Sequence, residues 1–220
     1  RAGAVGVFGG TFNPIRFGHL RSARELLERL PLDELRFVPA RQPPHRDAPQ
    51  VSAEDRAAMV ELAIAGEPRL RCDRRELERS GPSYTVDTLE SLRGELGDER
   101  PLALVLGGDA VLGLPGWHRW PRLLELAHLV VIARPGWQIP DDAEVAPLLR
   151  ERAIAPAQLL EGPAGGILQC SLTPQDISAT AVRALLQSGL DTADYLPQAV
   201  AGYIAGHGLY AQGEKGPSQR

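Results

Sequence analysis

Residues 4–8 (AVGVF) and the stretch Gly9–Leu20 (GGTFNPIRFGHL) that follows them decide the fold of this chain. The apolar segment is typical of a buried β-strand. It leads into a glycine-rich turn and then into a predicted helix that opens with Gly18 and His19. Backbone N–H groups at the start of such a helix are free to bind an anion. The stretch therefore predicts a phosphate site at the end of a buried strand.

The turn differs from the two commonest phosphate-binding loops. It contains no GxGxxG pattern, and the only lysine of the chain is Lys215, so no GKS or GKT sequence exists. Its distinctive side chain is His19. Taken alone, His19 is equally well explained as a surface histidine at a helix start, but the preceding glycine turn favours an anion site. We expect the helix dipole to disfavour the imidazolium form until an anion binds.

Apolar runs typical of buried strands recur along the chain and alternate with amphipathic stretches. This alternation predicts parallel βαβ units, and hence an α/β fold with a Rossmann-like, doubly wound parallel sheet flanked by helices and a small helical C-terminal part. We expect a single domain over residues 1–210 and a disordered tail over 211–220. The expected strands are residues 4–8, 35–39, 69–73, 102–107, 129–133 and 166–170.

The helices between these strands carry recognisable ends. Helix starts are expected at Ser52, at Ser83 or Tyr84, at Ser178 and at Pro197, and helix ends at Gly66 and Gly189. Two segments look irregular, residues 39–50 and 138–146. The first follows a strand and is rich in proline, so it lies at the carboxyl edge of the sheet, where doubly wound folds bind ligands. We expect it to be a substrate loop.

Composition excludes several classes of function. The net charge of −4 over 220 residues argues against general nucleic-acid binding. The chain has no apolar run of about 18 residues and no secretory leader, so we expect a cytoplasmic protein without a membrane partner. Cys72 and Cys170 are far apart and lack the CxxC spacing of zinc or redox sites. We expect no protein-held metal.

A second cluster lies at residues 176–183 (DISATAVR), at the start of another predicted helix. Ser178 is the expected N-cap, Thr180 lies in the first turn, and Arg183 follows one turn later. Hydroxyls, N–H groups and a guanidinium at one helix start can hold phosphate oxygens. The alternative is an ordinary capped helix with a solvated arginine, which a single occurrence favours. Two such helix starts, each after a strand, favour phosphate binding.

Both segments resemble signatures of the HxGH nucleotidyltransferase superfamily: GGTFNPIRFGHL is similar to GGTFDPxHxGH, and DISATAVR is similar to ISxTxxR. Other segments resemble one member family, the bacterial nicotinate-nucleotide adenylyltransferases. They are VPARQPPHR at 38–46, SYTVDTLE at 83–90, GGDAVLGLPGWHRW at 107–120, ARPG at 133–136 and LPQAVAGYIAGHGLY at 196–210. The resemblance covers nearly the whole chain, and SYTVDTL and GWHRW separate this family from its relatives.

The resemblance implies transfer of AMP from ATP to nicotinate mononucleotide, giving deamido-NAD and pyrophosphate. The attacking phosphate monoester is largely ionised at neutral pH, so no protein nucleophile is needed. The protein is expected to position the reactants and neutralise charge during in-line displacement at the α-phosphorus. His19 would contact the α-phosphate, while Ser178, Thr180 and Arg183 would hold the departing pyrophosphate. Mg²⁺ would arrive with ATP.

The matching motifs also imply which residues bind each substrate. Tyr84 and Thr85 stand at a helix start that can receive the nicotinate carboxylate. Trp117 offers a flat face to the pyridine ring or is an ordinary core aromatic. Asp109 can accept a bond from a ribose hydroxyl or cap a helix, and Arg134 is expected near the adenosine. The implied ATP and phosphate residues are Gly9, Gly10, Thr11, Phe12, Gly18, His19, Arg46, Ile177, Ser178 and Arg183. The implied nicotinate-nucleotide residues are Ser83, Tyr84, Thr85, Gly107, Asp109, Trp117 and Arg134.

The chain departs from the superfamily signature at two positions. Asn13 stands where aspartate is common, and Arg16 where the first histidine of HxGH or a threonine is expected. A guanidinium cannot accept a hydrogen bond but can neutralise phosphate, so we count Arg16 among the catalytic residues and predict retained but reduced activity. Two alternatives remain: another transferase of the superfamily, such as pantetheine-phosphate adenylyltransferase or a cytidylyltransferase, and a non-catalytic nucleotide-binding homologue. A Ser-His-Asp hydrolase is disfavoured because no GxSxG occurs.

Overall fold

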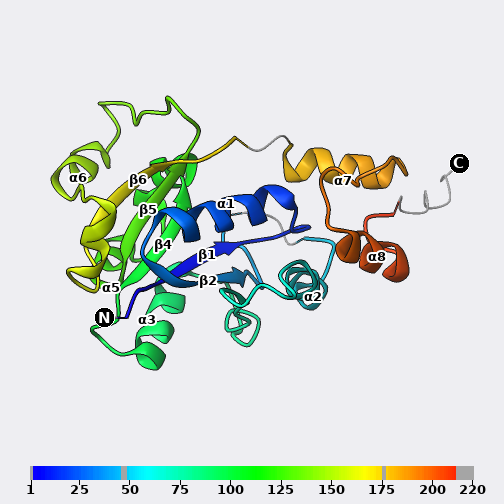
Figure 1. Ribbon diagram of the computed structural model, residues 1–220, viewed down its shortest axis with the longest axis horizontal. Helices are drawn as coiled ribbons and strands as arrows, with labels where there is room; N and C mark the ends of the chain where they lie inside the picture. Colours follow the sequence, from blue (N-terminus) through cyan, green and yellow to red (C-terminus); the bar gives the residue numbers. More distant parts are fainter. Residues whose placement is uncertain (1, 46–48, 175–176, 212–220) are drawn as a thin grey trace, which may run out of the picture.

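The computed structural model describes residues 2–45, 49–174 and 177–211. Its centre is a parallel sheet of six strands in the order β3-β2-β1-β4-β5-β6 (Figure 1). This strand order is that of a doubly wound Rossmann-like fold, so the predicted fold class is confirmed. The strands are β1 (Ala4–Gly10), β2 (Leu32–Pro39), β3 (Leu70–Cys72), β4 (Leu102–Gly107), β5 (His128–Ala133) and β6 (Ile167–Ser171).

The described helices begin close to the residues that the sequence indicated. Ser52 and Ser178 each accept a bond from the backbone N–H three residues later, as N-caps do. The first helix begins at Phe17, one residue before the expected Gly18, and the second ends at Ala63, before Gly66. The α-helices are α1 (Phe17–Arg29), α2 (Ala53–Ala63), α3 (Thr85–Leu96), α4 (Gly108–Leu112), α5 (Leu123–Leu126), α6 (Ala146–Glu151), α7 (Ala179–Gln187) and α8 (Gln198–His207). Short 3-10 turns are η1 (Leu114–Gly116), η2 (Trp120–Arg122) and η3 (Pro156–Leu160).

Strand β1 is the point at which the sheet changes its direction of growth. It pairs with β2 on one side, where Val7 lies opposite Arg36, and with β4 on the other, where Val7 lies opposite Leu104. The chain after β1 therefore turns towards one edge of the sheet, and the chain after β4 towards the other. The crevice that opens between the carboxyl ends of such strands is where doubly wound folds bind ligands.

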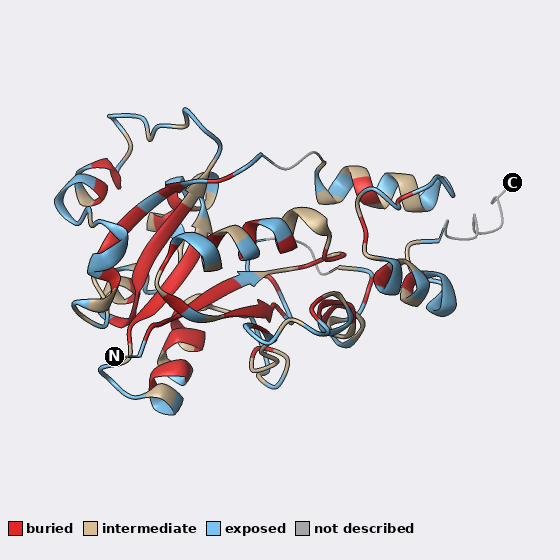
Figure 2. Ribbon diagram, in the orientation of Figure 1, coloured by how far each residue is buried: buried red, intermediate tan, exposed pale blue. Residues whose placement is uncertain are grey.

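The two faces of the sheet bury separate apolar cores. Along β1 the side chains alternate, so Ala4 and Phe8 face the core that contains α1 and α2, while Val5 and Val7 face the core that contains α3. Figure 2 shows the strands as the most buried part of the molecule, whereas α8 is largely exposed and α7 is mostly of intermediate burial. Helix α8 is held against α2, where the Tyr203 hydroxyl donates to Asp55 Oδ1 at 2.6 Å.

Some sequence expectations concern residues outside the described parts of the chain. These are Arg46 in the predicted substrate loop, Asp176 beside the second phosphate cluster, and residues 212–220 of the predicted tail. Residues 40–45, 49 and 50 of the predicted substrate loop belong to no helix or strand, as expected. No helix in the described part of the chain combines the length and apolar character needed to span a bilayer.

Candidate active site

Three cavities lie along the carboxyl ends of the strands. The central cavity, of about 890 Å³, is bounded by Gly10, by the α1 start and by the α7 start. The apolar cavity, of about 170 Å³, adjoins it at Gly10 and Thr11 and extends beneath Tyr84. The outer cavity, of about 270 Å³, lies beyond Ser22 at the ends of β4 and β5. The turn that follows β1, which contains Gly10 and Thr11, therefore lines both the central and the apolar cavity.

His19 is held at the α1 start by its neighbours on every side. The backbone N–H of Arg16, which is the N-cap of α1, donates to His19 Nδ1 at 3.2 Å. The ring packs edge-on against Phe12, with centroids 5.2 Å apart, and against Phe8 at 6.3 Å. Phe12 can reach the ring because Gly10 has no side chain: a Cβ there would lie 3.1 Å from Phe12. His19 lines the central cavity.

Arg16 and His19 direct donors to the same point. Because Nδ1 accepts the Arg16 amide, the neutral ring carries its proton on Nε2, an assignment inferred from that bond. Arg16 Nη1 lies 3.1 Å from this Nε2. Two N–H donors at this distance cannot bond to each other, but both can bond to one anionic oxygen. The guanidinium is also fixed at Nε, which donates to the Ile177 carbonyl at 3.1 Å.

The charge state of His19 follows from this environment. Burial and, secondarily, the neighbouring Arg16 lower the pKa of His19 from its ordinary 6.5 to about 3. Burial and, secondarily, Arg183 also lower the pKa of Arg16. The sequence led us to expect a disfavoured imidazolium because of the helix dipole. The direction agrees, but the main cause is burial of the ring behind Phe8 and Phe12.

The α7 start faces the α1 start across the central cavity. Ser178 Oγ accepts the Ala181 N–H at 3.1 Å, which leaves its own O–H able to donate. Arg183 joins the two starts: Nη2 donates to Thr180 Oγ1 at 3.3 Å, and Nη1 donates to the Asn13 carbonyl at 2.9 Å. Two motifs separated by more than a hundred residues therefore bring their hydroxyls and cations to one cavity.

The predicted phosphate residues divide by position. Gly9 lines only the apolar cavity. Gly18 and Ile177 line a small space of about 10 Å³ behind Arg16. Arg46 lies outside the described residues. The predicted catalytic and phosphate residues that do line the central cavity are Gly10, Thr11, Phe12, Arg16, His19, Ser178, Thr180 and Arg183.

Four of the predicted nicotinate-nucleotide residues, Ser83, Tyr84, Thr85 and Trp117, line the apolar cavity. Its walls are otherwise mostly apolar, and the Tyr84 ring stacks on His118 with centroids 4.2 Å apart. The Tyr84 N–H donates to the Pro82 carbonyl at 3.1 Å, so it is already engaged. The N–H of Thr85, the first residue of α3, has no acceptor within its own helix. Thr85 is therefore the first amide of this helix available to a ligand.

The other three predicted nicotinate-nucleotide residues, Gly107, Asp109 and Arg134, line the outer cavity instead. Trp137 covers this space and lies so close to Gly108 that a Cβ there would be 2.6 Å from its ring. The outer cavity begins one turn along α1 from His19, at Ser22. The structure thus separates the predicted set into two groups that line different cavities.

Sequence reasoning missed three polar residues that shape these cavities: Arg56 and Glu76, which are buried, and Tyr210, which is half-buried. Arg56 is 1% exposed and donates to the Thr11 carbonyl at 2.6 Å and, more weakly, to the Val51 and Arg41 carbonyls at 3.4 Å each. Tyr210 lines the central cavity and donates to Asn13 Oδ1. Glu76 lines the apolar cavity. Arg56 and Glu76 stand in charged stretches that resemble solvated surface, so no periodicity marks them, and Tyr210 adjoins the predicted tail.

Comparison with known proteins gives consistent relatives. The cytidylyltransferase-like family matches residues 7–185. A protein of Pseudomonas putida (strain W619) named "Probable nicotinate-nucleotide adenylyltransferase" is 51% identical over 206 residues, which are 94% of each chain. A protein of the same name from Pseudomonas aeruginosa (strain UCBPP-PA14) is 50% identical over 94% of this chain and 96% of its own. The likeness extends through both motifs and the segments between them.

Solved structures share the fold at lower identity. The nicotinic acid mononucleotide adenylyltransferase of Plasmodium falciparum, complexed with NaAD, superposes with a TM-score of 0.69 at 18% identity, covering 94% of this chain and 97% of its own. The same protein complexed with APC gives a TM-score of 0.67 at 19% identity. At such identity the likeness establishes the architecture of the sheet and its helices.

Proposed function

Because the chain belongs to the nicotinate-nucleotide adenylyltransferases, we propose that it transfers the adenylyl group of ATP to nicotinate mononucleotide, giving deamido-NAD and pyrophosphate. This is the family that the sequence motifs predicted. The observation that carries the proposal is the meeting of the α1 and α7 starts in one cavity, where Arg16, His19 and Arg183 supply donors to phosphate. A Plasmodium falciparum enzyme of this name and fold is complexed with NaAD in one structure.

The phosphates of ATP occupy the central cavity in this proposal. The α-phosphate lies between Arg16 and His19, where one anionic oxygen accepts from both donors. Ser178, Thr180 and Arg183 then hold the β- and γ-phosphates. An anion beside His19 favours the charged form of the ring, so ATP raises the pKa of His19 above its value in the free protein.

The adenosine extends from the α-phosphate into the outer cavity. Ser22 and His19 lie one turn apart on α1, so a nucleoside joined to a phosphate at His19 reaches this space directly. Arg134 was expected near adenosine, and Gly107 and Asp109 accompany it there rather than in the pyridine site. Trp137 provides an apolar ring for the base.

The acceptor approaches from the opposite side. The pyridine ring fills the apolar cavity beside Trp117, and its carboxylate receives the Thr85 N–H at the positive end of the α3 dipole. Its phosphate lies at the junction of the two cavities, by Gly10 and Thr11. From there an oxygen of the monoester attacks the α-phosphorus in line, and the bond to pyrophosphate breaks on the far side, towards Arg183.

The residues of the central cavity stabilise this displacement by charge. His19 Nε2–H and Arg16 donate to the oxygens of the α-phosphate as negative charge spreads over them, and Arg183 stabilises the leaving pyrophosphate. Protein side chains neither form a covalent intermediate nor abstract a proton. The high positive charge and the absence of any Asp or Glu among the described lining residues suit a polyphosphate rather than a bare cation.

Magnesium fits this site only as part of the nucleotide. Among the described residues no group of His, Cys, Asp or Glu side chains is arranged to hold a metal. Mg²⁺ would therefore be bound by phosphate oxygens and water, with the hydroxyls of Ser178 and Thr180 nearby. When bound it would neutralise charge on the β- and γ-phosphates.

The test is pyrophosphate release from ATP and Mg²⁺ in the presence of one acceptor at a time. We expect rapid release with nicotinate mononucleotide and slow release with nicotinamide mononucleotide, because only the acid carries the charge that the α3 start favours. Phosphopantetheine is the acceptor used by pantetheine-phosphate adenylyltransferase, the alternative activity within the superfamily. It should give no pyrophosphate release. Release with phosphopantetheine alone, or with no acceptor of the three, contradicts the proposal.

A further inference from the structure

Glu76 is the buried carboxyl of the apolar cavity. It lies in the turn after β3, is 6% exposed and lines the same space as Tyr84, Thr85 and Trp117. The aliphatic side chains of Val38, Val86 and Leu104 among others form the walls around it. A carboxylate is costly in such surroundings unless it is fully paired. The structure therefore places an acid, rather than a cation, beside the ring position proposed for nicotinate.

Hydroxyl groups hold Glu76 in place. The Thr88 hydroxyl donates to Glu76 Oε2 at 2.6 Å and accepts from Arg79 Nη2 at 2.8 Å. The Ser83 hydroxyl also bonds the Glu76 carboxyl, and Ser83 Oγ accepts the backbone N–H of Arg41 at 3.1 Å. Glu76 is thus fixed to the turn that starts α3 and, through Ser83, to the first residues of the predicted substrate loop.

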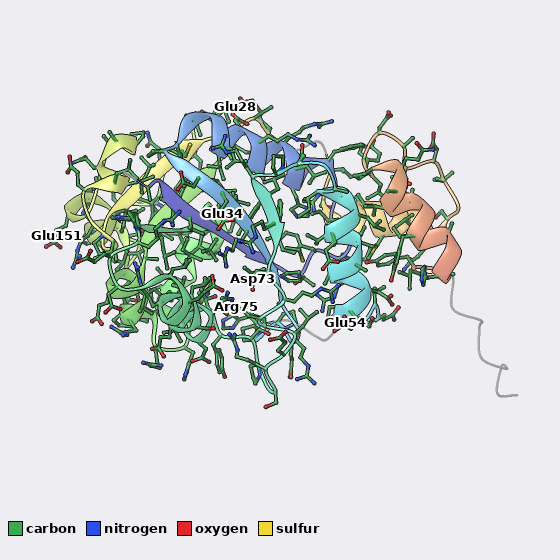
Figure 3. All side chains as sticks on the ribbon, turned by 60° about the horizontal axis from the view of Figure 1, so that its bottom comes forward. Glu28, Glu34, Glu54, Asp73, Arg75 and Glu151 are labelled. Carbon is green, nitrogen blue, oxygen red and sulfur yellow. The ribbon has the colours of Figure 1, made fainter. Side chains whose placement is uncertain are left out.

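The charged neighbours of Glu76 have opposing effects on its protonation. Arg79 favours the carboxylate, while Asp73 disfavours it. Asp73 is itself paired with Arg75 at 2.8 Å, and Figure 3 labels both residues. Asp73 is also paired with Arg36 at 3.1 Å. The other titratable side chains that line the cavity are His45, Tyr84 and His118. Burial outweighs the attraction of Arg79 and raises the pKa of Glu76 from its ordinary 4.5 to about 7.

We propose that Glu76 is a specificity-determining residue whose charge sets the preference of the apolar cavity for a pyridine acid over a pyridine amide. Protonated Glu76 tolerates the nicotinate carboxylate, whereas ionised Glu76 opposes it. Binding of the acid is therefore coupled to proton uptake at Glu76, and binding of the amide is not. The inference rests on the proposed function, because that function assigns the pyridine ring to this cavity.

The sign of the coupling follows from linkage. An anion bound beside Glu76 raises its pKa, so the complex holds a proton that the free protein has released above pH 7. Affinity for the acid relative to the amide must fall as the pH rises through this range. Each pKa unit of coupling corresponds to about a tenfold change in relative affinity. Both ligands carry the same ribose phosphate, so the ratio isolates the effect of the carboxylate.

The experiment compares nicotinate with nicotinamide mononucleotide from pH 6 to 8.5 at saturating ATP. In the unaltered protein we expect the ratio of kcat/KM values, acid over amide, to fall by about three- to tenfold. Glu76→Gln keeps the shape and a hydrogen-bonding group but cannot ionise, so the ratio should become independent of pH and stay high. Glu78→Gln, an exposed neighbour, is the matched control and should behave as the unaltered protein does.

Calorimetry provides a readout that does not depend on turnover. Titration of each mononucleotide in buffers of different ionisation enthalpy should show more proton uptake with the acid than with the amide near pH 7, and Glu76→Gln should abolish the difference. A ratio that does not vary with pH in the unaltered protein overturns the inference. So does a pH dependence that survives in Glu76→Gln but disappears in His45→Gln or His118→Gln. If neither acceptor yields pyrophosphate, the proposed function fails instead.

Discussion

The central and apolar cavities each contain a titratable group, the half-buried His19 and the buried Glu76, and the protein shifts the pKa values of the two groups in opposite directions. Burial lowers the pKa of the base His19 and raises the pKa of the acid Glu76, so both groups are largely neutral near pH 6. An anionic ligand beside either group raises its pKa. A site can therefore bind anions through neutral groups that gain or keep a proton when the anion binds, as well as through groups that are already positively charged.

The cavities differ in what remains charged. Arg16 and Arg183 keep the central cavity cationic, whereas the described lining of the apolar cavity contains no arginine or lysine. Side chains in the central cavity meet charge that develops during phosphoryl transfer, and those in the apolar cavity meet a ring that does not react. Substitutions in the first should therefore change kcat, and substitutions in the second should change KM for the acceptor.

His19→Ala should have the largest effect of the substitutions that test this difference between the cavities. Removing an N–H donor aimed at the reacting phosphate should lower kcat by about 10²- to 10³-fold, while KM for nicotinate mononucleotide changes little. The measurement is steady-state pyrophosphate release. His207→Ala, on the exposed end of α8, is the matched control and should retain full activity. A loss of less than about tenfold in His19→Ala would remove His19 from the transition state.

A pair of tryptophan substitutions sharpens the contrast between substrates. Trp117→Ala should raise KM for nicotinate mononucleotide by about tenfold, because the pyridine ring loses its aromatic partner. Trp137→Ala should instead raise KM for ATP by a similar factor, because this ring covers the outer cavity. Each variant is the control for the other. If both substitutions raise KM for the same substrate, the adenosine and the pyridine ring do not occupy separate cavities.

Much of this arrangement is predictable from sequence because it rests on local patterns. The six expected strands all occur, and Ser52 and Ser178 cap helices as their sequences indicate. The two phosphate motifs meet because both follow parallel strands, whose carboxyl ends share one edge of the sheet. Strand periodicity and capping chemistry act over a few residues, so a single sequence suffices to recognise them.

The remaining features depend on distant contacts. Asp109 and Arg134 follow strands β4 and β5 and line the outer cavity with Ser22 of α1, whereas Trp117 lines the apolar cavity with residues of α3. No local pattern separates these two groups. Arg56 looks like a solvated helix residue, yet it lies under the β1 turn with its guanidinium on backbone carbonyls. Glu76 looks like part of a charged surface run. In each case the environment is created by segments far away in the chain.

Arg16→His should have a smaller effect than the tryptophan substitutions. Arg16 supplies charge beside His19 but stands where the superfamily signature has a histidine or a threonine, so we expect kcat/KM to rise by about three- to fivefold when the imidazole is restored. Arg21→His, on the exposed face of the same helix, controls for a general effect of the new residue. Unchanged kcat/KM would mean that Arg16 already performs the full electrostatic role through its contacts with His19 and the Ile177 carbonyl.

The smallest expected effect concerns stability, and it tests the two neutral groups without any ligand. Folded His19 has a pKa of about 3 against an ordinary 6.5, so between these values the unfolded chain binds the extra proton and stability falls on acidification. Folded Glu76 has a pKa of about 7 against an ordinary 4.5, so there the folded protein holds the extra proton and stability falls as the pH rises.

The two contributions therefore oppose each other between pH 4.5 and 6.5, the window in which both groups differ between the folded and unfolded states. The free energy of unfolding from urea titrations should rise less steeply with pH in His19→Asn than in the unaltered protein, and more steeply in Glu76→Gln. The double variant should return towards the original slope. If both substitutions change the slope of the unfolding free energy against pH in the same direction, one of the two groups is charged in the free protein. The two cavities would then not both contain a neutral titratable group.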